Sequence, residues 1–185
     1  GNRRWARERG LPEAQGHAAG VEAIRPILER SVEKGIEVLS IYAFSRENWQ
    51  RADHDVRTLF SLLEGAIRDE TPRLREQGVR VRLLGRIEEL GADTRASIED
   101  ALALTADGTT MTLNVAFNYS SRSELVDAVR RCVADGLTPD EIGEEALDER
   151  LYTAGLPEPD LLIRTGGDQR VSNFLLWQAA YAELY

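Results

Sequence analysis

Short apolar runs alternate along this chain with longer amphipathic segments, and this alternation constrains the fold more than any other feature. Four runs are predicted as strands, at 37–44, 79–84, 110–117 and 161–163. The segments between them repeat apolar residues at helical spacing, over 16–34, 53–77, 88–104 and 123–134. Strands that alternate with helices form parallel sheets with right-handed crossovers. The sequence therefore predicts an α/β fold, with one domain over residues 1–185 and a parallel-sheet core flanked by helices.

The composition excludes several classes of function. The chain has 185 residues and a formal net charge of -9, which argues against nucleic-acid binding because that function needs a basic face. Small anionic ligands need only a few local arginines and stay possible. The single cysteine, Cys132, rules out an internal disulfide and a CxxC metal site, and it fits a cytoplasmic protein. No apolar run approaches the ~18–20 residues that span a bilayer.

The last stretch, 159–185, is predicted as a strand, a turn at Gly166–Gly167 and then a helix. The turn carries Arg164, Arg170 and Ser172. In open α/β sheets such a turn lies at the carboxyl edge, where ligands bind. Two guanidiniums and a hydroxyl near a helix start suit a phosphate group. The alternative interpretation is that these arginines pair with surface acids, which the chain has in plenty.

Two other predicted strands also end in polar turns. The strand 37–44 runs into 45–51, which carries Ser45, Arg46, Glu47, Asn48, Trp49 and Arg51. The strand 110–117 runs into 118–122, which ends in Arg122 as a candidate anion contact or helix anchor. Polar groups just past a buried strand are the usual place for α/β chemistry. The alternative for 45–51 is a helix cap with a packed tryptophan.

The N-terminus adds a further group of cations. Four arginines fall within residues 1–10, behind a turn favoured by Gly1 and Asn2, and they are a second candidate anion site. The alternative interpretation is a frayed basic terminus, which is common. His17 is expected in the first turn of the helix 16–34, where a lone histidine is more often structural than catalytic. Each charge-assisted hydrogen bond to phosphate contributes about 1.5–3 kcal/mol. A ligand with two diphosphates explains so many guanidiniums better than one with a single phosphate.

The motifs of other phosphate-binding enzymes are absent from the sequence. There is no G-x-x-x-x-G-K-[ST] and no G-x-G-x-x-G after a strand. There is also no D-D-x-x-D, the aspartate-rich motif of trans-type prenyl synthases.

The motifs that are present resemble those of the cis-prenyltransferases, and most closely the undecaprenyl diphosphate synthase type. They occur in the expected order as G-N-R-R-W-A, G-H-A-A-G, Y-A-F-S-R-E-N-W-Q-R, N-Y-x-x-R and D-L-L-I-R-T-G-G-D-Q-R-V-S-N-F-L-L-W-Q-A-A-Y-A-E-L-Y. The resemblance covers essentially the whole chain. It implies repeated condensation of isopentenyl diphosphate onto an allylic diphosphate, with Mg²⁺ as cofactor and new double bonds in the cis form.

The resemblance also implies a role for each motif residue. The allylic diphosphate would be held by Gly1, Asn2, Arg3, Arg4 and Trp5, helped by His17 and Arg51. Isopentenyl diphosphate would be held by Arg164, Arg170, Val171 and Ser172. Further substrate contacts would come from Ser45, Arg46, Glu47 and Trp49. Asn48, with Ser45 beside it, would help to remove a proton, and Glu183 would bind Mg²⁺.

The growing lipid requires an apolar substrate tunnel that excludes water. The helix predicted at 53–77 is expected to form its wall, although periodicity alone cannot separate a tunnel wall from an ordinary core. Ala43 is small, which favours a medium or long product, and a short product is the alternative. The family implies a homodimer, and a lipid product would allow peripheral membrane contact.

The chain departs from the family pattern at four places. The family's catalytic aspartate would directly precede Gly1, and relatives continue beyond Tyr185, so we expect a chain shortened at both ends. Glu13 stands where an arginine is usual, and Ser120–Ser121 replaces two glycines. A non-catalytic subunit of a prenyltransferase complex is therefore an alternative. The survival of the other motif residues favours an enzyme.

Overall fold

Three parallel strands form the centre of the molecule, in the order β1–β3–β2. They comprise β1 (Val38–Ser45), β2 (Val79–Leu84) and β3 (Met111–Tyr119). Val115 of the central strand lies opposite Ile41 of β1 and Leu83 of β2. The structure is a computed structural model that describes residues 2–185. It confirms the α/β fold with a parallel sheet between helices.

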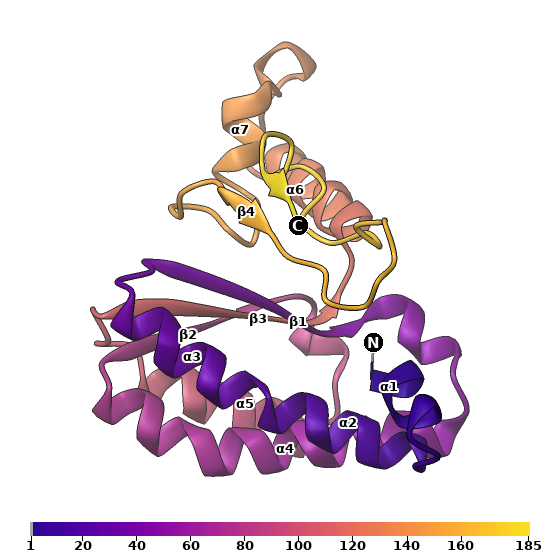
Figure 1. Ribbon diagram of the computed structural model, residues 1–185. Helices are drawn as coiled ribbons and strands as arrows, with labels where there is room; N and C mark the ends of the chain where they lie inside the picture. The colour runs from indigo at the N-terminus through magenta and orange to yellow at the C-terminus, as the bar shows by residue number, and fades with distance from the viewer. Residues whose placement is uncertain (1) are drawn as a thin grey trace.

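The helices cover the sheet unequally (Figure 1). One face carries the larger layer, made of α2 (Glu13–Glu22), α3 (Ile24–Glu33), α4 (Asp53–Glu76) and α5 (Ala92–Leu104). The other face carries α6 (Ser121–Ala134), α7 (Glu144–Asp148) and a small parallel sheet of β4 (Leu161–Leu162) and β5 (Glu183–Leu184). The short helix α1 (Asn2–Glu8) packs against α2 at one end of the larger layer. Three 3-10 turns complete the described elements: η1 (Arg46–Gln50), η2 (Ile87–Glu89) and η3 (Pro139–Glu141).

The sheet is buried on both faces, as continuous apolar strands predict. Towards the larger helical layer, Leu28 and Leu74 pack with Val79, Met111 and Leu113. Towards the other face, Leu84, Ala116, Tyr119 and Leu175 form a separate cluster. The rings of Tyr42 and Phe174 stack there with their centroids 4.6 Å apart. The C-terminal segment is thereby fixed onto β1.

The predicted helix at 16–34 is two helices that meet at Ala23. Pro26 lies in the first turn of α3 and has no backbone N–H, so the hydrogen bond that would continue α2 across this point cannot form. Because α2 already begins at Glu13, His17 lies in its second turn rather than its first. The predicted helix at 88–104 begins only at Ala92, after η2.

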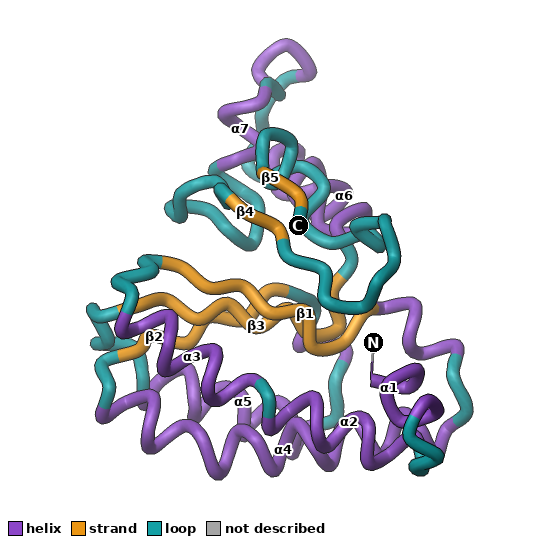
Figure 2. The backbone as a smooth tube through the Cα atoms, viewed as in Figure 1, coloured by secondary structure: helices purple, strands orange, loops and turns teal. Residues whose placement is uncertain are grey.

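The prediction of a helix after Gly167 is wrong. Between β4 and β5 the chain forms a series of turns, drawn as loop in Figure 2. Ser172, Asn173 and Leu175 have positive φ angles of 50°, 60° and 46°, which no right-handed helix accommodates. The predicted strand at 161–163 also lies outside the central sheet and pairs with β5 instead.

The turns after Gly167 are stabilised by contacts with α6 rather than by a helix of their own. The carbonyl oxygen of Asn173 accepts a hydrogen bond from Ser121 N (3.0 Å). Its side-chain oxygen accepts one from Arg122 N, also at 3.0 Å. Ser121 Oγ accepts a further bond from Leu176 N (3.0 Å). The first two of these bonds satisfy free backbone N–H groups at the N-terminus of α6, so tertiary contacts outweigh the helical spacing of the apolar residues.

Candidate active site

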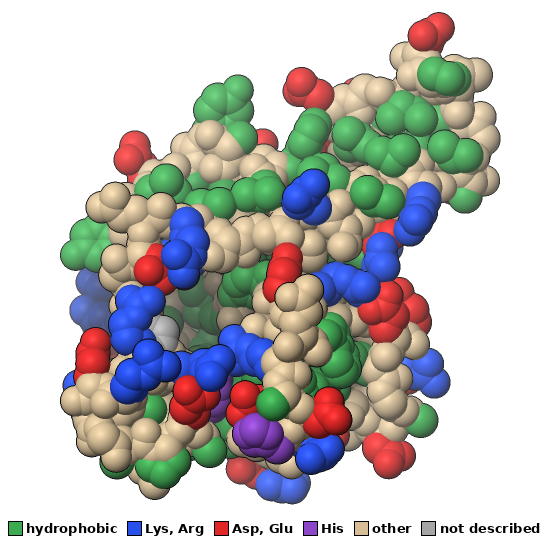
Figure 3. Space-filling view, turned by 90° about the vertical axis from the view of Figure 1, so that its right-hand side faces the viewer, with side chains coloured by type: hydrophobic (Ala, Val, Ile, Leu, Met, Phe, Trp, Pro, Cys, Tyr) green, Lys and Arg blue, Asp and Glu red, His purple; other side chains and the backbone are tan. Residues whose placement is uncertain are grey.

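A cavity of about 920 Å³ opens between the larger helical layer, the sheet and the 164–172 loop. Figure 3 shows a hollow bordered by basic side chains, with hydrophobic side chains in its depth; the basic residues that line the cavity are arginines and His17. The hydrogen-bonding and charged groups that line its mouth come from four segments, namely α1, α2, the 45–51 turn and the 164–172 loop: Asn2, Arg3, Arg4, Arg7, His17, Ser45, Asn48, Arg51, Arg164, Arg170 and Ser172. The structure thus brings together most residues that the sequence nominated.

Two glycines of α2 explain how α1 reaches this mouth. A Cβ atom at Gly16 would lie 2.2 Å from the carbonyl oxygen of Asn2. A Cβ atom at Gly20 would lie 2.5 Å from Nδ2 of the same residue. Only glycine permits so close an approach. The G-H-A-A-G motif therefore seats the arginines of α1 beside His17.

The α1 side of the mouth has more positive than negative charge. Burial lowers the pKa of His17, and nearby Arg51 lowers it further. Burial also lowers the pKa of Arg51, and Arg3 adds to that effect. Glu13 compensates in part, because its Oε2 lies 2.6 Å from Arg3 Nε. An anion bound here would favour the charged form of all three basic groups, Arg3, Arg51 and His17.

The 164–172 loop forms the opposite side of the mouth. Arg164 Nη1 donates to the Arg170 carbonyl (2.8 Å) and to Ser172 Oγ (2.9 Å). Its Nε is buried and has no hydrogen-bond partner among the described residues. A buried donor without a partner costs free energy, and an anionic oxygen would satisfy it. Asp168 lies among Arg4, Arg164 and Arg170, and their hydrogen bonds lower its pKa, with that from Arg4 the largest cause.

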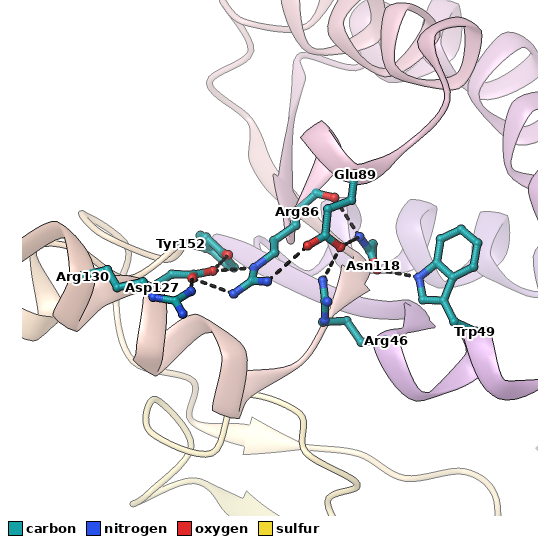
Figure 4. Close-up of polar contacts among 8 residues, drawn as sticks. All are labelled: Arg46, Trp49, Arg86, Glu89, Asn118, Asp127, Arg130 and Tyr152. Carbon is teal, nitrogen blue, oxygen red and sulfur yellow. Dashed lines mark hydrogen bonds and ion pairs between the residues drawn. The ribbon is translucent and has the colours of Figure 1, made fainter.

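A network behind the sheet edge holds the turn that carries Asn48 (Figure 4). Trp49 Nε1 donates to Asn118 Oδ1 (2.8 Å). Asn118 Nδ2 in turn donates to Glu89 Oε2 (3.0 Å), which also accepts from Arg46. Asn118 is fully buried with a φ of 49°, a conformation that asparagine tolerates better than most residues. The network fixes η1 against the ends of β2 and β3.

The network continues away from the cavity to α6. Arg86 Nη1 lies 3.1 Å from Glu89 Oε1, and its Nη2 lies 2.6 Å from Asp127 Oδ1. Tyr152 OH donates to Asp127 Oδ2 (2.7 Å). Burial alone would raise the pKa of Asp127, but the hydrogen bonds from Arg86 and Tyr152 outweigh it and the pKa is lowered. These contacts stabilise the fold and do not line the cavity.

The depth of the cavity is apolar. Side chains of α4 line it along much of the helix, and α5 and the sheet close it: Leu59, Leu62, Leu63, Ala66, Ile67, Leu74, Ile98, Ala101, Leu102, Leu113 and Val115. Ala43 of β1 also faces it. One ion pair interrupts this surface, with Arg25 Nε 3.1 Å from Glu70 Oε1.

Several predicted site residues lie outside the lining of this cavity. Trp49 and Arg46 bond to Asn118 and Glu89, as described above, and Glu47 Oε1 accepts from Asn173 Nδ2 (2.8 Å). Trp5 lies under Arg9, whose Cζ is 4.4 Å from the ring centroid. The others that do not line the cavity are Arg122, Val171 and Glu183. Gly1 lies outside the described residues.

The sequence interpretation missed four residues that shape the mouth. Arg7 lines the cavity and could have been found, since it belongs to the N-terminal arginine run. Asp168, Asn118 and Asn173 gave no signal, because each acts through at least one partner that is distant in the sequence: Arg4, Trp49 and Glu47, respectively. Asn173 bridges Glu47 and Ser120.

Two features are absent from residues 2–185. No three histidine, cysteine, aspartate or glutamate side chains gather where they could hold a metal ion. No helix there combines the length and apolar character needed to cross a bilayer.

Comparison with known proteins gives consistent matches over the whole chain. The family model described as "Putative undecaprenyl diphosphate synthase" matches residues 1–185. An isoprenyl transferase of Heliobacterium mobile is 48% identical over 189 aligned residues, which cover 100% of this chain and 73% of the relative. An isoprenyl transferase of Agrobacterium fabrum is 47% identical, covering 99% of this chain and 76% of the relative.

Two solved structures are also similar. Lavandulyl diphosphate synthase from Lavandula x intermedia, in complex with dimethylallyl diphosphate, has a TM-score of 0.95 and 33% identity, covering 100% of this chain and 82% of that one. A probable undecaprenyl diphosphate synthase from Campylobacter jejuni has a TM-score of 0.82 and 32% identity, covering 91% of this chain and 78% of that one.

Proposed function

The chain belongs to the undecaprenyl diphosphate synthase family and is a prenyltransferase, and from that premise we propose that it condenses isopentenyl diphosphate onto an allylic diphosphate such as farnesyl diphosphate. The product would be a cis-polyprenyl diphosphate, either undecaprenyl diphosphate or a similar chain. In each cycle the bond between the allylic carbon and its diphosphate breaks. That carbon joins the terminal alkene carbon of isopentenyl diphosphate, and a proton leaves.

One observation carries this proposal: a mouth rich in guanidiniums opens into an apolar cavity. The two diphosphates need the guanidiniums of the mouth, and the hydrocarbon chain needs the apolar cavity behind them. Arg3, Arg4 and Arg51, with His17, would hold the allylic diphosphate. Neutralising its charge makes it a better leaving group. The apolar depth would exclude water from the reacting carbon.

Isopentenyl diphosphate would bind at the other side of the mouth. Arg164 and Arg170 line it together with Ser172, and the unpaired Nε of Arg164 offers a donor there. Asn48 and Ser45 line the same cavity and would help to remove the proton. Neither is a strong base, so the final proton acceptor would be the released diphosphate.

Mg²⁺ would assist the departure of diphosphate, as the family resemblance implies. This ion usually takes one or two carboxylates together with substrate phosphates and water. Glu183, the predicted ligand, is exposed in β5 and does not line the cavity. The geometry of a single protomer therefore does not bring Glu183 to the proposed substrate, and we assign no step to it.

Product length would depend on the apolar depth. Ala43 faces the cavity with a small side chain and leaves room for a growing chain, which favours a medium or long product. A short-chain cis-prenyl diphosphate synthase is the second candidate. The similarity to lavandulyl diphosphate synthase, at a TM-score of 0.95, favours this alternative.

We further expect a homodimer. Large apolar side chains are exposed on the C-terminal segment and on α6, at Leu161, Ile163, Tyr181, Leu184, Tyr185, Val126, Val129 and Val133. Val126, Val129 and Val133 of α6 are 48%, 41% and 62% exposed, and exposed apolar side chains gathered on one helix fit a surface that another protein covers. Peripheral contact with a membrane would follow from release of a lipid product.

Product analysis of the full-length protein tests the function. It would be incubated with farnesyl diphosphate, labelled isopentenyl diphosphate and Mg²⁺, and the products separated by chain length. We expect label in a lipid fraction, and none after EDTA treatment. No incorporation with either farnesyl or geranyl diphosphate would contradict an enzyme and favour the non-catalytic subunit.

A further inference from the structure

One carboxylate oxygen at the cavity mouth contacts three guanidiniums. Oδ2 of Asp168 lies 2.9 Å from Arg4 Nη2, 3.0 Å from Arg170 Nη2 and 3.2 Å from Arg164 Nη2. All three arginines line the cavity. An acidic side chain in the middle of a proposed anion site is unexpected, because it adds repulsion to any diphosphate that binds.

The three arginines depend on this carboxylate to different degrees. Arg164 has two further hydrogen bonds, to the Arg170 carbonyl and Ser172 Oγ, and stays in place without it. Arg4 has one further bond, to the carbonyl of Gly166. The Arg170 guanidinium contacts only Asp168 among the described residues, and the side chain is 64% exposed. Arg170 therefore depends most on Asp168.

The carboxylate also joins the two sides of the mouth. Arg4 belongs to α1, on the side proposed for the allylic diphosphate. Arg164 and Arg170 belong to the loop proposed for isopentenyl diphosphate. Like charges this close repel each other, and a shared counter-charge removes that cost. The single oxygen Oδ2 of Asp168 is thus shared by both sides of the mouth.

We propose that Asp168 is a positioning residue for both substrates, because its carboxylate holds Arg4 and Arg170 where they bind diphosphate. The inference rests on the proposed function, since it needs diphosphates at both sides of the mouth. It opposes the simplest electrostatic expectation, in which removing a negative charge from an arginine cluster strengthens anion binding. The lowered pKa of Asp168 is consistent with a carboxylate that stays ionised throughout.

The test compares Asp168→Asn and Asp168→Glu in the full-length protein. Asparagine keeps the shape but lacks the charge. Loss of charge-assisted hydrogen bonds of about 1.5–3 kcal/mol corresponds to a rise of about tenfold or more in KM for isopentenyl diphosphate. A smaller rise is expected in KM for farnesyl diphosphate, with kcat changed less than either. Glutamate should restore most of the affinity.

Glu158→Gln is the matched control, because Glu158 is exposed, forms no ion pair in the described chain and does not line the cavity. It removes the same charge and should leave both KM values unchanged. A lower or unchanged KM in Asp168→Asn would overturn the proposal. So would equal losses in kcat and affinity that glutamate does not rescue.

Calorimetry with inorganic diphosphate separates this inference from the proposed function. The wild type should bind the probe, and Asp168→Asn should bind it about tenfold more weakly. Equal binding by both proteins contradicts the positioning role even where no product forms. If the wild-type protein forms no prenyl product, the proposed function is contradicted instead.

Discussion

The mouth and the depth of the cavity are built in opposite ways. The mouth is assembled from α1, η1 and the 164–172 loop, which ion pairs and side-chain hydrogen bonds hold together. The depth is assembled from α4, α5 and the central sheet, whose apolar faces follow directly from their periodicity. The difference suggests that charge at the mouth and shape in the depth control separate properties. Substrate affinity and rate would belong to the mouth, and product length to the depth.

Replacing Arg164 should give the largest effect. Arg164→Met removes a guanidinium and its buried Nε from the mouth, so kcat/KM should fall about 100-fold or more, while the length of the residual product stays unchanged. Steady-state kinetics and product separation would check both parts. Arg75→Met is the control, because Arg75 is exposed on α4 and does not line the cavity. A shortened product in Arg164→Met would break the separation of mouth and depth.

A bulky side chain in the depth should have the opposite effect to Arg164→Met: product length should change and the reaction rate should change little. Ala43→Leu fills part of the cavity, so the longest products should disappear while the first condensation keeps its rate within about threefold. Chromatography of labelled products would show the shift in length. Ala103→Leu, at an exposed position of α5 that does not line the cavity, should leave the distribution unchanged. Unaltered product length in Ala43→Leu would place the growing chain elsewhere.

Neutralising Glu13 and neutralising Asp168 should change the KM values of the substrates in opposite directions. Glu13 pairs with Arg3 at 2.6 Å, and its ion pairs among the described residues reach only α1, whereas Asp168 joins α1 to the 164–172 loop. Glu13→Gln frees Arg3, so the KM for farnesyl diphosphate should fall about threefold, in line with a partly exposed ion pair. Initial rates at varied primer concentration would measure it. A rise in KM would show that Glu13 also positions its arginine.

The smallest expected effect is on pH dependence. The pKa of His17 is lowered by burial and by Arg51, so its protonation favours the unfolded chain. Stability should therefore fall as the pH drops below the ordinary histidine pKa of about 6.5. The ligand-free wild type should lose on the order of 1 °C more in Tm than His17→Asn between pH 7.5 and 5.5. Inorganic diphosphate should remove the difference, and its persistence with ligand would separate His17 from the anion site.

Most of the fold was predictable because its elements are regular. The three central strands and α4 lie within two residues of their predicted bounds, since long periodic segments carry strong signals. The turns at 172–181 were not predictable in this way. Their residues have helical spacing, but Asn173 and Leu175 adopt left-handed conformations where the segment packs on α6.

The residues of the mouth were predictable from the sequence only where they are arginines in an otherwise acidic chain. Arginines such as Arg164 are conspicuous in an acidic chain, and most of those predicted to bind substrate line the cavity. Arg46 and Trp49 were equally conspicuous, yet both contact the scaffold through Glu89 and Asn118. Sequence alone cannot separate these cases, because the partners lie tens of residues away.

The contact between Arg4 and Asp168 has a consequence for the order in which the protein matures. These residues are 164 positions apart, so α1 leaves the ribosome long before its partner loop is made. Domains fold during synthesis from the N-terminal side, and contacts between distant residues form late. The sheet and its helices can therefore pack around an open cavity before the mouth exists. Completion of the mouth would be the last step of maturation, so a nascent chain would lack the site proposed for isopentenyl diphosphate until the 164–172 loop had docked.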